Sequence, residues 1–231
     1  MSSDIERVLV VPSELRRDDF FDFTGFVKTN EERTKELLDV VDDHYWFHRR
    51  DKAEEDVSLL QIIPYVVITR PSKNGLEYYT YQRTSGGGDS RLHGQMSIGL
   101  GGHVNPCDIA DLVNETLINN IRRELDEEVD IFDGQGNDID AYSIKTSRFK
   151  VVGEIYSNDS PVSEVHYGIV YQLDLNDPNA QVALRETHKM RDLGWYQLHE
   201  LEEIKFGTEG FESWSRLFID SFEKEQDNAL V

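Results

Sequence analysis

Apolar and polar positions follow one another along the chain in short blocks, and their spacing predicts both strands and helices. Runs rich in apolar, β-branched and aromatic residues predict strands at residues 7–12, 59–69, 76–83, 96–100, 149–157, 165–175 and 193–196. Apolar residues three and four apart predict helices at residues 31–41, 117–129, 198–204 and 211–225, the first capped by Asn30. Turn-forming residues separate consecutive strands, so we expect the strands to pair mostly as hairpins.

These elements favour a mixed α/β fold in which a sheet is sandwiched between helices. Residues 1–57 are too few and too polar to hold a core alone, so we expect an N-terminal extension that packs on the main domain. The main domain is expected at residues 58–225, and residues 226–231 are expected to form a frayed tail.

The composition narrows the functional classes. The chain has 231 residues, of which 38% are hydrophobic, and can therefore bury a core. Its formal net charge of −21 repels a nucleic-acid backbone, and no basic stripe offsets that charge, so nucleic acid is excluded as a partner. A single cysteine, Cys107, rules out an intrachain disulfide and suits a reducing compartment. No apolar run fits a signal peptide or a membrane span, so a cytoplasmic protein is expected.

The predicted helix at residues 117–129 carries a dense group of charges. At the pitch of an α-helix, Glu124, Glu127 and Glu128 share one stripe that borders the apolar face, and Thr116 is the expected N-cap. Neighbouring carboxylates repel one another unless a cation lies between them, and hard divalent cations such as Mg²⁺ prefer oxygen ligands. A solvated helix face is the alternative, because 30% of all residues are charged.

Residues 115–131 resemble the Nudix box, whose pattern is G-x5-E-x7-R-E-U-x-E-E-x-G-U, where U is an aliphatic residue. The part E-x7-R-E-U-x-E-E matches at every fixed position. Two positions depart from the pattern. The first glycine would fall on Ile109, and the nearest glycines are Gly101 and Gly102. Counted from Gly102, the loop before Glu115 is seven residues longer than in the pattern. Asp130 replaces the later glycine after the last helical turn, where the left-handed conformation is often needed.

The resemblance covers residues 58–225 and implies the Nudix fold, an α/β/α sandwich. It also implies a hydrolase that depends on Mg²⁺ or Mn²⁺ and cleaves a small-molecule substrate, a nucleoside diphosphate linked to another group X. Membrane partners are not implied, and homodimers are common in the family.

Site residues are carried over from the family one by one. Glu124, Glu127 and Glu128 would be metal ligands, and Glu115 would be an outer ligand or support. Arg123 would orient the glutamates through a salt bridge. Such a metal site neutralises the oxygens of a pyrophosphate and lowers the pKa of bound water.

Other residues outside the box are candidates, each with a structural alternative. Glu164 is the first candidate for a further base or metal ligand and Glu154 the second, while an exposed loop carboxylate is the alternative for both. His103 could contact a phosphate or make a structural hydrogen bond, and His166 could share a sheet face with Glu164. Arg83 could hold an anionic substrate, and a solvent-exposed arginine is the alternative.

The double glycine Gly101-Gly102 is a further candidate substrate contact, besides His103 and Arg83.

Two other functions stay open. One is a Nudix-like module that senses nucleotide-type ligands without catalysis. The other resembles isopentenyl diphosphate isomerases, which have a cysteine just before Gly-His, whereas Gly101 occupies that position here and Cys107 lies nearby. The complete set of glutamates favours the hydrolase.

Overall fold

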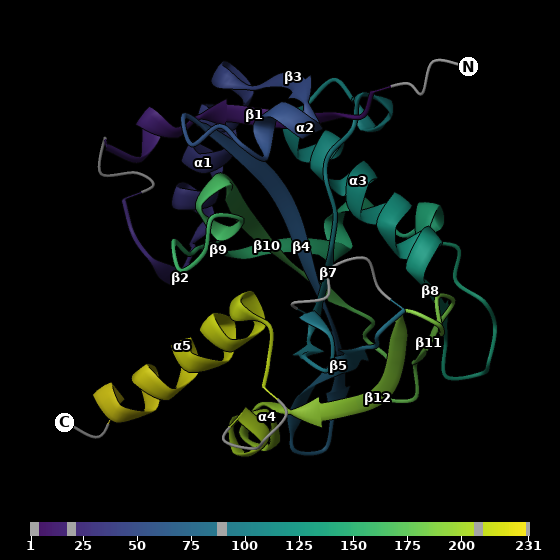
Figure 1. Ribbon diagram of the computed structural model, residues 1–231. Coiled ribbons are helices and arrows are strands. Elements are labelled where there is room, and N and C mark those ends of the chain that lie inside the picture. Colours follow the sequence, from purple (N-terminus) through teal and green to yellow (C-terminus); the bar gives the residue numbers. More distant parts are fainter. Residues whose placement is uncertain (1–4, 18–21, 87–91, 206–209, 230–231) are drawn as a thin grey trace. The chain divides into compact units, whose positions relative to one another are not determined.

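A computed structural model describes residues 5–17, 22–86, 92–205 and 210–229. It confirms a mixed α/β fold with a large sheet and several helices (Figure 1). Contacts between residues divide the chain into two units, and each unit combines segments far apart in sequence. The first unit comprises Met1–Tyr65, Gly101–Ile121 and Val151–Tyr171. The second unit comprises Val66–Leu100, Arg122–Lys150 and Gln172–Val231.

In the first unit, β1 (Arg7–Pro12) has the bounds that its apolar run predicts. It pairs antiparallel with β3 (Trp46–Arg49) and with the start of β4 (Leu59–Ser72), so its backbone is hydrogen-bonded on both sides. The short helix α2 (Arg50–Ala53) lies beside β1 and β3 (Figure 1). Four buried side chains of this part form a core cluster, namely Val8, Val10, Ala53 and Leu59.

Helix α1 (Glu31–His44) begins at the cap that the sequence predicts. The side chain of Asn30 accepts a hydrogen bond of 2.8 Å from the backbone N–H of Arg33. Leu37 and Val41 are fully buried and lie four residues apart, which places them on one face of the helix.

The first unit also contains a strand that the sequence did not predict, β2 (Gly25–Lys28). It pairs antiparallel with β9 (Phe149–Tyr156), with Phe26 opposite Ile155. A 3-10 turn then leads into β10 (His166–Asp174). The 3-10 turns of both units, η1, η3, η4, η5 and η6, are Ser13–Arg17, Pro106–Asp108, Ala141–Ser143, Thr146–Arg148 and Ser163–Val165.

The second unit contains the predicted hairpin. The end of β4 pairs antiparallel with β5 (Gly75–Arg83), with Thr69 opposite Tyr78. On its other edge β5 pairs with β12 (Met190–Gln197), which is longer than the sequence predicts. Further elements of the second unit are β6 (Met96–Ser97), β7 (Gly99–Gly101), β11 (Gln181–Leu184), α4 (Leu198–Lys205) and α5 (Ser213–Ala229).

Helix α3 (Val113–Glu128) starts earlier than the sequence analysis predicts, and the assignment of Thr116 as its N-cap is wrong. Thr116 lies inside the helix and is fully buried, and its hydroxyl accepts a 2.9 Å hydrogen bond from the N–H of Ala110. The expected left-handed residue after the helix is also absent, because Asp130 lies in β8 (Val129–Phe132), which pairs with β11. The chain therefore passes from α3 directly into a strand.

Helix α5 continues to Ala229, four residues beyond the predicted end. Residues 230–231 lie outside the described residues, and both the frayed tail and the boundary at residues 57 and 58 stay predictions. Among the described residues, no helix is long and apolar enough to cross a membrane.

A buried ion pair joins α1 to β9 inside the first unit. Glu154 is 0% exposed, and its carboxylate accepts hydrogen bonds from Arg33 Nε at 2.7 Å and from the Tyr167 hydroxyl. Removing one partner of such a pair leaves a buried charge without compensation, which is strongly destabilising. The carboxylate of Glu154 is therefore part of the fold of this unit.

We expect Arg33→Met to lower the free energy of unfolding by about 3 kcal/mol, because Glu154 would keep its charge in the interior without a cation. Urea denaturation followed by circular dichroism measures the change. Lys35→Met is the matched control on the same helix, since Lys35 pairs with Asp39 at the exposed surface and should change the stability little. Equal midpoints for the two variants would refute the structural role of the Arg33–Glu154 pair.

Candidate active site

The second half of α3 presents three carboxylates in the second unit. Leu125 and Val129 are buried, and Glu124 and Glu128 next to them are half-buried because the helical pitch places them beside the apolar face. Glu127 is the outermost of the three, with 57% of its side chain exposed. The predicted stripe of glutamates beside an apolar face is therefore present.

Arg123 holds two of these carboxylates. Its Nη1 lies 2.8 Å from Glu124 Oε1 and 3.3 Å from Glu127 Oε1. The second contact joins residues one helical turn apart, which is the spacing at which side chains on a helix meet. This arrangement supports the orienting role proposed for Arg123.

Of the three glutamates, Glu128 lies in the environment that is least favourable for a negative charge. Burial, together with the carboxylates of Glu124 and Glu186, raises the pKa of Glu128 to about 7 against the opposing effects of Arg83 and Lys189. A carboxylate in such surroundings is ionised more easily when a cation binds next to it. Carboxylate oxygens are the donor atoms that Mg²⁺ and Mn²⁺ prefer in proteins.

The neighbouring cations of the second unit bind other carboxylates. Arg83 Nε donates to Glu212 Oε1 at 2.5 Å, and Lys189 Nζ donates to Glu186 Oε1 at 2.6 Å. Arg83 is only partly exposed and also lies over the ring of Tyr81, 5.5 Å from its centroid. A solvent-exposed arginine, the alternative that the sequence offered, is therefore not what the structure shows.

Glu115 and Glu164 lie in the first unit. Glu115 is exposed in the first turn of α3, and Glu164 is exposed in η6, where its backbone carbonyl accepts a 3.2 Å hydrogen bond from the hydroxyl of Tyr156. Glu164 is not in a strand, so the expectation that it shares a sheet face with His166 is wrong. Glu154 is bonded to Arg33 and Tyr167, which supports a structural role for the second candidate.

A buried carboxylate helps to hold the loop that is longer than the Nudix pattern. Asp108, in η3, is 3% exposed, and its Oδ2 accepts hydrogen bonds from the N–H of Asn105 at 2.8 Å and from Asn120 Nδ2 at 3.3 Å. The thiol of Cys107 is exposed on the same turn. Gly101 permits close approach to β4, because a Cβ atom there would lie 2.9 Å from the carbonyl oxygen of Pro64.

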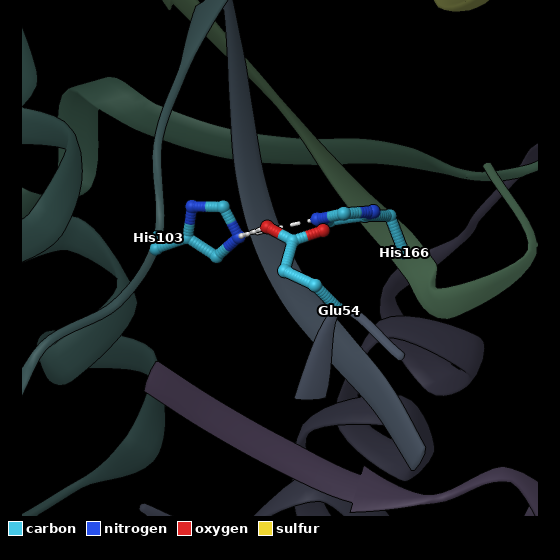
Figure 2. A group of neighbouring side chains, drawn as sticks. All are labelled: Glu54, His103 and His166. Atoms are coloured by element: carbon cyan, nitrogen blue, oxygen red, sulfur yellow. Dashed lines mark hydrogen bonds and ion pairs between the residues drawn. The ribbon is translucent and has the colours of Figure 1, made fainter. Parts of the chain in front are cut away.

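His103 and His166, two candidates from the sequence, meet in the first unit. Their Nε2 atoms are 3.1 Å apart, and Glu54 Oε1 lies 3.8 Å from His103 Nε2 (Figure 2). Burial lowers the pKa of His166 below its usual range, and a hydrogen bond to the Val162 carbonyl opposes this shift. Sequence analysis missed Glu54, which lies within the predicted extension in a segment with no motif.

Comparisons with known proteins agree with this architecture. No protein-family model matches the chain. Protein YmaB of Bacillus subtilis (strain 168) is 36% identical over 223 residues, which cover 94% of this chain and 98% of YmaB. The crystal structure of Tm1382, a provisionally assigned Nudix hydrolase, matches with a TM-score of 0.65 and 26% identity over 94% of this chain and 98% of Tm1382. A Nudix hydrolase from Alicyclobacillus acidocaldarius matches in fold, with a TM-score of 0.52 and 15% identity over 70% and 90% of the two chains.

We expect the apo protein to become less stable than its Glu128→Gln variant as the pH rises. The folded-state pKa of about 7 lies above the ordinary glutamate value, so between the two values the folded state holds a proton that the unfolded state has lost. The free energy of unfolding therefore falls through this range, whereas glutamine cannot ionise. The variant should gain about 2 kcal/mol relative to the wild type at pH 8 and nothing at pH 4.

Urea denaturation in EDTA at a series of pH values measures this difference. Glu127→Gln is the matched control, since the Glu127 side chain is mostly exposed and its removal should not reproduce the pH dependence. If the difference in the free energy of unfolding between Glu128→Gln and the wild type stays constant from pH 4 to pH 8, Glu128 does not have a raised pKa in the folded state.

Proposed function

Because the chain belongs to the Nudix hydrolase superfamily, we propose that it hydrolyses the diphosphate linkage of a nucleoside diphosphate joined to another group, with Mg²⁺ or Mn²⁺. The single observation that carries this proposal is the helix α3, on which the Nudix pattern of glutamates coincides with a partly buried carboxylate whose pKa is about 7.

The metal ligands in this proposal are Glu124, Glu127 and Glu128, with Glu115 as an outer ligand or support. A divalent cation bound there would neutralise phosphate oxygens and lower the pKa of bound water. Arg123 keeps the carboxylates of Glu124 and Glu127 in place by its contacts of 2.8 and 3.3 Å, which reduces the freedom that the ligands lose on metal binding.

The remaining roles are assigned by chemistry. Glu164, which is exposed on a short turn, is the proposed general base and would take a proton from the attacking water. Arg83 is the proposed contact for the anionic substrate, and Gly101, Gly102 and His103 are further proposed substrate contacts. A cytoplasmic location and a homodimer complete the proposal, supported by the single cysteine and by the resemblance to the family, respectively.

We expect Glu124→Gln and Glu128→Gln each to lower kcat by about 100-fold or more. Each variant removes a proposed metal ligand itself, not a residue that only contacts a ligand. Asp126→Asn is the matched control on the same helix, because Asp126 pairs with Arg185 at 3.2 Å and belongs to no proposed ligand set. Phosphate or nucleotide release with Mg²⁺ and with Mn²⁺ is the measurement. Full activity in Glu128→Gln would sink the ligand assignment.

The substrate class can be tested with the wild-type protein. Nucleotide sugars, dinucleoside polyphosphates, ADP-ribose, NADH, coenzyme A and nucleoside triphosphates form a suitable panel, with EDTA as the control. We expect turnover of at least one diphosphate, and loss of that turnover in EDTA. If no member of the panel turns over with either metal while one of them binds, the protein is a nucleotide-sensing module and not a hydrolase.

A further inference from the structure

Three side chains from separate parts of the sequence converge in the first unit. Glu54 directly follows α2, His103 follows β7, and His166 is the first residue of β10. Figure 2 shows the two imidazole rings turned toward each other with the Glu54 carboxylate beside them. One ligand atom from each residue lies within 4.8 Å of the other two.

The hydrogen bonds of His166 decide which of its nitrogens carries the proton. His166 Nδ1 lies 2.6 Å from the carbonyl oxygen of Val162, and because a carbonyl can only accept, Nδ1 is the protonated nitrogen. In the neutral ring, Nε2 therefore presents its lone pair toward His103 Nε2, 3.1 Å away. Metal-binding histidines are commonly oriented in this way, by a hydrogen bond from the other ring nitrogen to a backbone carbonyl.

The distances match those between ligands of one small cation. In a tetrahedral zinc site with bonds of about 2.0–2.1 Å, neighbouring ligand atoms are about 3.3 Å apart. The two Nε2 atoms are 3.1 Å apart, and Glu54 Oε1 lies 3.8 Å from His103 Nε2. A small movement of the Glu54 side chain, which is only partly buried, brings its oxygen to the same separation.

We propose that Glu54, His103 and His166 bind a divalent transition-metal ion of the zinc type. Imidazole nitrogen suits Zn²⁺ and its neighbours in the first transition row, whereas Mg²⁺ takes oxygen ligands. Two histidines and one glutamate supply three ligands and leave one position for water, an arrangement found in zinc sites that are open to a further ligand. The site has a donor set different from that of the glutamates on α3. It shares only His103 with the proposed substrate contacts, and zinc binding to it does not require the proposed hydrolysis.

Two features of the surroundings support a built site. Asn120 Nδ2 donates to the backbone carbonyl of His103 at 2.9 Å, which fixes the position of the loop that carries this histidine. Arg50 lies 3.4 Å from Glu54 Oε1 and 3.0 Å from Glu6 Oε2, so it shares its charge between two carboxylates and leaves Glu54 only partly neutralised. A bound cation would complete that neutralisation.

Zinc retention by the full chain tests the proposal. The protein is incubated with Zn²⁺, dialysed against zinc-free buffer that contains excess Mg²⁺ to compete at oxygen-only sites, and analysed for zinc by mass spectrometry. We expect one zinc per chain in the wild type. His103→Gln and Glu54→Gln should each lower zinc affinity by at least about 10-fold, since each removes a ligand.

His44→Ala is the matched control. His44 Nδ1 also lies near the carbonyl four residues earlier, 2.9 Å from Val40 O, but His44 is exposed at the end of α1. Among the described residues it belongs to no group of metal-ligating side chains. The His44→Ala variant should retain zinc as the wild type does. Circular dichroism confirms that each variant is folded. A Zn²⁺-dependent rise in Tm, present in the wild type and lost in Glu54→Gln, is a second measure that needs no dialysis.

The double variant Glu124→Gln, Glu128→Gln separates this site from the proposed hydrolytic one. It should lose turnover and keep its zinc. If it loses the zinc while His103→Gln keeps it, the metal binds to the glutamates of α3 and the proposal is wrong. A wild type that retains no zinc and shows no Tm shift overturns the proposal too, without bearing on the hydrolase.

Discussion

Burial of carboxylates at the edge of α3, increased in effect by the repulsion between them, is the constraint on which the candidate active site depends. Leu125 and Val129 are buried, and because a helix turns once every 3.6 residues, burying them also draws Glu124 and Glu128 into the half-buried edge of the same face. The pKa of Glu128, raised to about 7, expresses the resulting cost of ionisation. The apolar packing of the helix thus makes a negative charge on Glu128 unfavourable unless a cation lies next to it.

The surrounding cations lessen this repulsion without removing it. Arg83 binds Glu212, and Lys189 binds Glu186, so the charge of each is already shared with another carboxylate. Both lower the pKa of Glu128, yet burial and the neighbouring carboxylates outweigh them. An arginine bonded directly to Glu128 would have neutralised the charge of its carboxylate and prevented a metal ion from binding to it.

The sequence alone predicted those parts of the molecule that depend on short-range spacing. The bounds of β1, the cap of α1 at Asn30 and the stripe of glutamates on α3 each follow from residues within one or two helical turns or one strand. The start of α3 was predicted wrongly because Thr116 is not the N-cap. Its buried hydroxyl accepts a hydrogen bond from the N–H of Ala110 instead. Strands β2 and β3 were missed because only their pairing partners stabilise them.

The triad of Glu54, His103 and His166 could not be predicted for the same reason. No two of its members are near one another in sequence, and only the fold of the first unit brings them within 4.8 Å. A formal net charge of −21 attracts divalent cations in general and does not choose among them. The choice comes from the donor atoms. Carboxylate oxygens close together on a helix suit Mg²⁺, whereas two facing imidazoles suit a softer ion. Two sites with different donor atoms in one acidic chain can therefore prefer different metal ions.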